Sequence, residues 1–172
     1  KQTIRWFGMK QQNYDANFCG PLDGLKVLDL SRLVAGNMLS LQLADYGAEV
    51  IKVENAGDGG DVGRHVRHPN EALPKGDSLF FQSFNRNKRS IKLNLKSIGG
   101  QEILRKLAAG AEGVFNNLRG DLPDKMGLTY DDLKSVNPQI VCVHLSAYGR
   151  GNDRAAWPGY DYLMQAECGY LS

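Results

Sequence analysis

The feature that most constrains the fold is a strand, a helix and a second strand within residues 25–54. Residues 25–30 form a short apolar run between Gly24 and Ser31, which is typical of a buried strand. Residues 38–46 carry leucine and alanine at helical spacing and stop at Gly47, which indicates a helix. Residues 49–54 predict the second strand. A crossover helix joins parallel strands with a right-handed connection, so this segment predicts a βαβ unit.

Strands and helices continue to alternate along the rest of the chain. Further strands are expected at residues 90–95, 113–116 and 139–146, and helices at 79–84, 98–109, 130–135 and 161–169. Residues 55–78, which have no periodicity, predict a long loop. The alternation predicts an α/β fold with an open, mostly parallel, Rossmann-like sheet and helices on both faces. Ligands in such folds bind at the carboxyl ends of the strands.

The same pattern predicts the domain organisation. Residues 1–20 are polar and rich in helix breakers, so we expect a lead-in arm, followed by one α/β domain over residues 21–172. A chain of 172 residues with 42% hydrophobic content can bury one core. Because the last expected helix reaches the final residues, we expect this domain to be an incomplete part of a longer protein.

Charge and cysteine content narrow the classes of partner. The chain has 21 basic and 19 acidic residues, a net charge of +2, which gives no case for a nucleic-acid or membrane partner. No apolar run is long enough to span a bilayer. Its three cysteines are odd in number and lack paired spacing, so we expect free thiols in a reducing compartment. These features favour the cytoplasm, or an organelle matrix in a eukaryote.

Two local patterns each allow a functional and a purely structural interpretation. The small-residue turn at Ser31–Asn37, between a strand and a helix, exposes backbone N–H groups that suit a phosphate, a carboxylate or a thioester carbonyl. It lacks the glycine spacing of dinucleotide and P-loop sites, and it can simply be a turn. Residues 85–90 hold three cations, which fit either a solvated turn or a basic edge for a polyphosphate that Lys96 would extend.

Other polar residues favour structural roles. Asp161 opens a predicted helix and is expected to cap it, although a carboxylate there could also orient a ligand. His65 and His68 lack a convincing third ligand, so no metal site is expected. His144 lies in an apolar strand, which favours a hydrogen-bonded core residue. The chain has no GxSxG motif of a serine hydrolase.

Eight short segments match one known family in order and spacing from about residue 21 to the end. The segments are Pro21–Leu30, Arg32–Gly36, Leu43–Glu54, Asn85–Ile91, Met126–Leu128, Asn137–Pro138, Ser146–Gly149 and Gly159–Asp161. Together they resemble the class III CoA-transferases, the family of formyl-CoA and carnitine CoA-transferases, which also includes the α-methylacyl-CoA racemases. The series as a whole carries this resemblance, since each segment alone is weak.

The resemblance implies a chain that binds coenzyme A, as part of an acyl-CoA substrate, and no metal. The positions that match the family's CoA contacts are Asn55, Leu93, Lys96, Asn117, Leu118, Lys125 and Met126. Lys96 and Lys125 are the natural partners for the phosphates. The positions that match supporting sites near the reacting thioester are Val34, Ala35, Tyr160 and Asp161.

The implied activity is transfer of CoA between an acyl-CoA and a carboxylic acid. In the family an aspartate attacks the acyl-CoA, giving a mixed anhydride and then an aspartyl-CoA thioester. The resemblance places that aspartate after Ser172, so no nucleophile is expected in this chain, which alone should be inactive. The racemases carry a histidine where Tyr160 stands, which argues against racemisation. A racemase or lyase on this scaffold, and a non-catalytic CoA-binding or dimerisation module, remain the alternatives.

Two turns depart from the family pattern. The family usually has proline at the position of Asn37, and a turn containing proline and glycine where Asn117–Asp121 stands. We therefore expect both ligand-side turns to be looser here. The resemblance also implies much longer chains that form interlocked homodimers.

Overall fold

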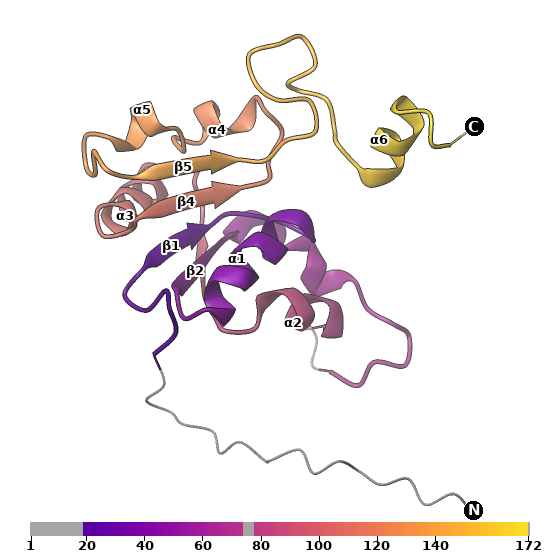
Figure 1. Ribbon diagram of the computed structural model, residues 1–172, viewed down its shortest axis with the longest axis horizontal. Coiled ribbons are helices and arrows are strands. Elements are labelled where there is room, and N and C mark those ends of the chain that lie inside the picture. The colour runs from indigo at the N-terminus through magenta and orange to yellow at the C-terminus, as the bar shows by residue number, and fades with distance from the viewer. Residues whose placement is uncertain (1–18, 74–77, 172) are drawn as a thin grey trace, which may run out of the picture.

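The computed structural model describes residues 19–73 and 78–171, so most of the expected lead-in arm lies outside the described residues (Figure 1). Five parallel strands form one sheet in the order β3-β2-β1-β4-β5. They are β1 (Lys26–Asp29), β2 (Glu49–Asn55), β3 (Lys88–Leu93), β4 (Gly113–Asn116) and β5 (Val141–His144). This confirms the α/β fold. The strand order reverses between β1 and β4, where open α/β sheets form their ligand crevice.

Helices lie between successive strands, and one more follows β5. They are α1 (Ala35–Asp45), α2 (Leu79–Asn85), α3 (Ile98–Ala108), α4 (Leu122–Lys125), α5 (Tyr130–Leu133) and α6 (Asp161–Glu167), with the 3-10 helices η1 (Ala56–Asp58) and η2 (Val62–His65). Helix α1 begins three residues before the prediction, because Ala35 and Gly36 have small side chains that give no apolar periodicity. The described part of the expected loop 55–78 contains η1 and η2, which begin at the side-chain caps Asn55 and Asp61.

The start of β3 was predicted two residues too late. The strand begins at Lys88, where we expected a polar turn. Lys88 is a buried lysine whose Nζ lies 3.1 Å from Asp29 Oδ2. A lysine that is paired with a carboxylate can be buried in a strand. The apolar alternation that signals a strand is therefore absent at this end of β3.

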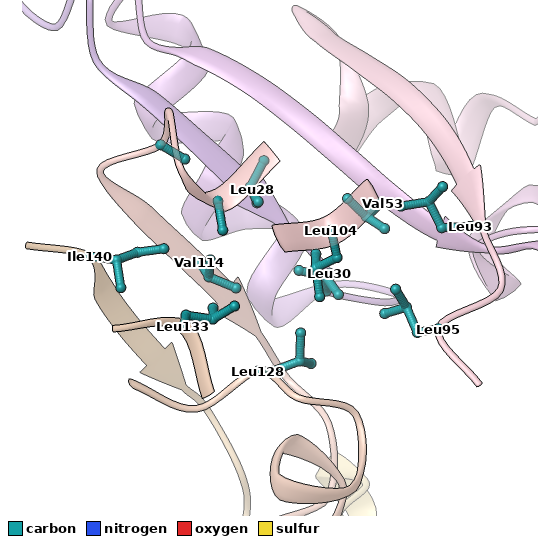
Figure 2. Packing of buried hydrophobic residues seen from close by; sticks show 12 residues of the cluster. Leu28, Leu30, Val53, Leu93, Leu95, Leu104, Val114, Leu128, Leu133 and Ile140 are labelled. Carbon is teal, nitrogen blue, oxygen red and sulfur yellow. The ribbon is translucent and has the colours of Figure 1, made fainter. Parts of the chain in front are cut away.

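The core lies on both faces of the sheet, which places helices on both faces as predicted. The larger cluster packs α3 residue Leu104 against strand residues such as Leu28 and Val114 (Figure 2). The smaller cluster, on the α1 face, joins Val27 and Val50 to Ala44. Alternate residues of a strand point to opposite faces, so Val27 and Leu28 enter different clusters.

The buried face of α3 and two polar side chains of β5 complete the description of the core. Helix α3 buries Gly100, Leu104 and Ala108, which share one face at a spacing of four, whereas Ile103 is exposed. Cys142 is a partly buried free thiol that packs against the larger core cluster. His144 is hydrogen-bonded as expected, through its Nδ1 at 2.8 Å from Asn116 Nδ2.

Candidate functional site

Two cavities adjoin at the carboxyl ends of the strands. The first has a volume of about 250 Å³ and is lined by Leu30, Ser31, Arg32, Val53, Glu54, Asn55, Asp58, Gly60, Asp61, Leu93, Leu95, Lys96, Leu118, Leu122 and Met126. The second has a volume of about 610 Å³ and is lined by Arg32, Leu33, Ala35, Val62, Asn117, Leu118, Arg119, Leu122, Leu145, Ser146, Ala147, Tyr148, Trp157, Pro158, Gly159 and Tyr160. Since Arg32, Leu118 and Leu122 line both, the two cavities lie side by side near the point where the strand order reverses, and together they are called the groove.

The first cavity gathers most of the predicted CoA contacts. Its lining includes Asn55, Leu93, Lys96, Leu118 and Met126, which come from the ends of β2, β3 and β4 and from α4. These positions are far apart in sequence and meet only because parallel strands end at the same sheet edge.

Of the two remaining predicted CoA contacts, Asn117 and Lys125, only Asn117 lines a cavity. Asn117 lines the second cavity, next to Leu118. Lys125 lines neither cavity, and its Nζ lies 2.7 Å from Asp121 Oδ2 on the surface. Lys96, by contrast, makes no side-chain salt bridge within residues 19–73 and 78–171, which leaves its ammonium available to a ligand phosphate.

Of the four positions expected near the reacting thioester, two line the second cavity and two line neither cavity. Ala35 and Tyr160 line the second cavity, from opposite ends of the described chain. Val34 immediately precedes Ala35, and its side chain is partly exposed. The cap prediction for Asp161 is wrong, because Tyr160 occupies the N-cap of α6 and Asp161 lies in the first turn. The Asp161 carboxylate instead accepts a hydrogen bond from Gln165 Nε2 at 2.6 Å.

The Asn117 amide ties two of the lining turns together. The Arg32 backbone N–H donates to Asn117 Oδ1 at 2.7 Å, and Asn117 Nδ2 donates back to the Arg32 carbonyl at 2.8 Å. The turn after β4 is therefore fixed to the turn after β1. The expectation that it would be loose is wrong, because a side-chain amide supplies the order that we had assigned to proline and glycine.

The turn between β1 and α1 was also expected to be loose, and the contacts of Asn37 show that this expectation is wrong. Its side chain is fully buried in the first turn of α1, and its Nδ2 donates to the Leu33 carbonyl at 2.9 Å. The same Nδ2 donates to Asp61 Oδ2 at 2.8 Å, and Lys52 Nζ donates to Asn37 Oδ1 at 2.7 Å. The turn between β1 and α1 is therefore tightly held.

Two buried carboxylates remain charged beside the first cavity. Burial alone would raise the pKa of Glu54, but hydrogen bonds from Arg64, Ser90 and the Asp61 backbone lower that pKa to about 2. Arg64 reaches Glu54 through Nε at 2.7 Å and through Nη2 at 2.6 Å. Burial likewise opposes ionisation of Asp61, but the charge of Lys52 and the bonds from Asn37, Lys52 and Gly63 lower its pKa to about 2.

The basic segment 85–90 lies away from the groove. Arg86 Nη2 is 2.5 Å from Asp45 Oδ2 at the end of α1, and Arg89 Nη2 is 2.9 Å from Glu49 Oε1 at the start of β2. Lys88 points into the core and pairs with Asp29. These cations stand at the amino end of β3, whereas Lys96 follows its carboxyl end, so the structure favours an ion-paired turn over a polyphosphate edge.

The model of CoA-transferase family III matches residues 22–172 of the chain. The chain belongs to this family. Among the relatives of this family III chain, a succinyl-CoA:glutarate CoA-transferase of Homo sapiens is 36% identical over 96% of the chain and 36% of its own length. A succinate–glutarate CoA-transferase of Agrobacterium fabrum is 37% identical over 88% of the chain and 38% of its own length. The chain therefore spans less than half the length of these relatives.

Solved structures of the family share this fold. A CAIB/BAIF family protein from Brucella suis superposes with a TM-score of 0.78 at 37% identity, covering 88% of the chain and 40% of that protein. Rv3272 from Mycobacterium tuberculosis gives a TM-score of 0.80 at 35% identity, covering 90% of the chain and 42% of that protein. The resemblance drawn from the eight sequence segments is confirmed.

The described part of this family III chain shows neither a metal-binding cluster nor a membrane-spanning helix. Within residues 19–73 and 78–171, no group of three or more histidine, cysteine or acidic side chains is placed to hold a metal ion. None of the helices in this described part is long and apolar enough to cross a membrane.

Sequence reasoning missed several residues that line the groove. Arg32 lines both cavities and its guanidinium lies 3.8 Å from Asp58, which lines the first, yet we had noted it only as part of a family segment. Its position directly after β1, at the reversal of strand order, was the available signal. Leu122 also lines both cavities, and its helix α4 was not predicted because it has only four residues, including Pro123.

Proposed function

We propose that the protein containing this chain transfers coenzyme A between an acyl-CoA and a carboxylic acid. The observation that carries the proposal is the first cavity, which gathers Asn55, Leu93, Lys96, Leu118 and Met126 at one sheet edge. Family membership supports the same reaction class, and two relatives are named for CoA transfer involving succinate and glutarate.

The lining of the first cavity suits a nucleotide. Val53, Leu93, Leu95 and Met126 supply apolar surface on which an adenine ring can pack. Lys96 supplies a cation for a phosphate. Glu54 and Asp61 are already neutralised by Arg64 and Lys52, so they repel the phosphates less than free carboxylates would. We infer that this cavity holds the nucleotide, within a CoA-binding domain that includes residues 21–172.

The second cavity would receive the thioester end of the substrate. It begins beside Ala35 in the turn after β1 and continues to Tyr160. In the proposed reaction an aspartate, expected after Ser172, attacks the thioester carbon and CoA leaves as the thiolate. The thiolate then attacks the mixed anhydride, giving an aspartyl-CoA thioester and releasing the donor acid. The acceptor acid takes its place in the reverse sequence of steps.

Mass spectrometry of the full-length protein tests this reaction. Incubation with an acyl-CoA and an acceptor acid, with succinate and glutarate in the first panel, should exchange CoA between the acids and give a covalent carboxyl–CoA adduct. Absence of both exchange and adduct with every acid tried would contradict the proposal. Deuterium incorporation at the α-carbon without CoA exchange would instead support a racemase, which the tyrosine at position 160 argues against.

A pair of lysines tests the nucleotide site by itself. Lys96→Ala removes a cation that lines the first cavity, whereas Lys92→Ala removes one that does not and whose Nζ donates to the Gly59 carbonyl. We expect Lys96→Ala to raise the Kd of CoA about tenfold, as loss of one charge-assisted phosphate contact does. Lys92→Ala should change that Kd by less than about twofold. Equal effects in calorimetric titrations would contradict the assignment.

The resemblance also leads us to propose a homodimer. Sedimentation of the full-length protein should give twice the chain mass. A monomer at micromolar concentration would contradict this part of the proposal and would leave the assignment of the nucleotide cavity unchanged.

A further inference from the structure

A buried polar cluster lies beneath the turn that connects β1 to α1. It consists of Asn37, Lys52 and Asp61, each at most 2% exposed. Lys52 Nζ lies 2.9 Å from Asp61 Oδ2 and donates to Asn37 Oδ1 at 2.7 Å. Asn37 Nδ2 closes the triangle with its bond to Asp61 Oδ2. A buried ion pair seldom stabilises a fold better than apolar residues would, so this cluster calls for another role.

Each member of the cluster also bonds to the backbone of the turn. Lys52 Nζ donates to the Ser31 carbonyl at 2.8 Å. The Leu33 backbone is held on both sides, because its carbonyl accepts from Asn37 Nδ2 and its N–H donates to Asp61 Oδ1 at 3.1 Å. The cluster therefore fixes consecutive peptide groups of the turn from below.

The turn needs this support because its backbone is strained. Leu33 has a φ of 65°, in the left-handed region. Such a conformation costs about 1–2 kcal/mol for a residue with a side chain and persists only where surrounding contacts impose it. Next along the chain, Val34 occupies the N-cap of α1 and gives no side-chain cap, and Ala35 lines the second cavity.

The next residue of α1 fixes how closely the turn packs. A Cβ added at Gly36 would lie 2.1 Å from Ser31 Oγ, so α1 approaches the end of β1 more closely than any larger residue allows. The course of the backbone through Val34 to Ala35, which lines the second cavity, therefore depends on the exact course of Ser31–Leu33, which the cluster holds.

We propose that Asn37 and Lys52, with Asp61, are positioning residues that orient the backbone of Val34 and Ala35 beside the reacting thioester. This inference rests on the proposed function. Asn37 and Lys52 line neither cavity, so they can act on the substrate only through the turn. Their loss should therefore slow the reaction of bound substrate and leave CoA affinity nearly unchanged.

The experiment compares variants of the full-length protein. In Asn37→Ala the donor to Leu33 and the acceptor for Lys52 are lost. We expect kcat to fall about tenfold or more, as misplacement of reacting groups does, and the calorimetric Kd of CoA to change less than about threefold. Hydrogen exchange of the amides at residues 33–36 should accelerate.

A core variant supplies the matched control for stability. Leu104 is fully buried in α3 and belongs to the core cluster on the other face from α1. Leu104→Ala should lower the thermal midpoint at least as much as Asn37→Ala, with kcat per folded enzyme within about twofold of the original. It should also leave exchange at residues 33–36 unchanged.

A double variant separates positioning from stability more sharply. Lys52→Met together with Asp61→Leu replaces the ion pair by apolar groups, which commonly restores the stability that a single charge removal destroys. The bonds to Ser31 and Leu33 stay lost, so kcat should remain low although the thermal midpoint recovers relative to Lys52→Met alone. Recovery of kcat in step with the midpoint would overturn the proposal.

Two further outcomes decide the matter. If Asn37→Ala raises the Kd of CoA and leaves kcat unchanged, the positioning role is overturned and Asn37 contributes to CoA binding instead. If the original protein transfers no CoA, the proposed function fails, and hydrogen exchange then decides by itself whether the cluster holds the turn. Acceleration at residues 33–36 in Asn37→Ala but not in Leu104→Ala supports that part, and equal exchange in both overturns it.

Discussion

The carboxyl end of the sheet and residues 145–171 both contribute to the groove, but they are held in different ways. At the sheet end, side chains such as Asn37, Lys52 and Glu54 are buried and bonded to the turns that they support. Residues 145–171 contain no buried residue, and Figure 1 shows α6 set apart from the sheet. Their contacts with one another lie on the surface, such as the bond from Tyr148 Oη to Glu167 Oε1 at 3.0 Å.

This difference indicates which part of the site is held in place by the core of this chain. The first cavity is formed by strands and by turns tied to one another, so its shape follows from the core. Tyr160, in contrast, reaches the second cavity from a segment with exposed aromatic side chains, and is itself 52% exposed. We therefore expect perturbations of the sheet end to cost stability and perturbations of residues 145–171 to cost little.

Acidification should cause the largest loss of stability, and it should act at the carboxyl end of the sheet. The pKa values of Glu54 and Asp61 are each lowered to about 2 in the folded protein, from ordinary values of 4.5 and 3.8. Their contribution is therefore complete above about pH 4.5 and is lost as the pH falls towards 2. Each unit by which a pKa is lowered corresponds to about 1.4 kcal/mol, so the free energy of unfolding should fall by several kcal/mol in total.

Chemical unfolding of the full-length protein between pH 5 and pH 2 measures this loss. Hydrogen exchange in the same series should show the amides around β2 and η2 opening first. A free energy of unfolding that stays constant over this range would show that these carboxylates are not stabilised by the folded protein.

Truncation of a core side chain should cause the next largest loss of stability. Leu28 is fully buried at the centre of the sheet, and Leu28→Ala should lower the free energy of unfolding by about 2–5 kcal/mol through lost burial and a cavity. Tyr162→Ala, which truncates an exposed side chain of α6, should change it by less than about 0.5 kcal/mol. Denaturant titrations of the two variants measure the contrast directly, and similar losses would remove the distinction between the two regions.

Removal of the Asn117 amide, which joins the turns after β1 and β4, should cost an intermediate amount of stability. Asn117→Ala leaves the Arg32 N–H and carbonyl without their partners and should cost about 1–3 kcal/mol, measured by thermal unfolding. The matched change in the other region is Tyr148→Phe, which removes only the exposed bond to Glu167 and should cost less than about 0.5 kcal/mol. A larger loss for Tyr148→Phe than for Asn117→Ala would reverse the ranking.

The smallest effect, which concerns CoA binding, should come from Asp121, a partly buried carboxylate beside Arg119 of the second cavity. Asp121 lies 2.7 Å from Lys125 Nζ and 3.3 Å from Arg119 Nε, and so competes with a ligand phosphate for both cations. Asp121→Asn should tighten CoA binding about two- to fivefold at low salt and less at high salt. Asp131→Asn is the control, because it releases only Lys134, which lines neither cavity and is not a predicted CoA contact, whereas Asp121→Asn releases Arg119 of the second cavity and the predicted contact Lys125. Calorimetric titrations in which both variants bind CoA equally would contradict the competition.

The sequence predicted the fold well because apolar runs of four to six residues mark buried parallel strands. It predicted β4 at its observed bounds and β1 and β2 to within one residue at each end. It failed where polar residues enter the core, since Lys88 conceals the start of β3 by pairing with Asp29. The site residues of the first cavity could be named only through the family resemblance, because they meet through the parallel arrangement of the strands.

Asn37 marks the limit of sequence reasoning at the site. Compared with the usual proline, it predicted a looser turn, whereas its amide binds Leu33, Lys52 and Asp61. Those partners come from the turn, from β2 and from the start of η2, so no local pattern could have joined them. Tertiary hydrogen bonds of this kind become visible only when the strands are placed beside one another.

Hydrogen exchange of the full-length protein with and without CoA tests most directly the claim that the carboxyl end of the sheet holds the nucleotide. Saturating CoA should increase amide protection at residues 53–55, 93–96 and 117–126, with little change at residues 85–90. Binding of CoA accompanied by protection only outside residues 30–126 would contradict the account.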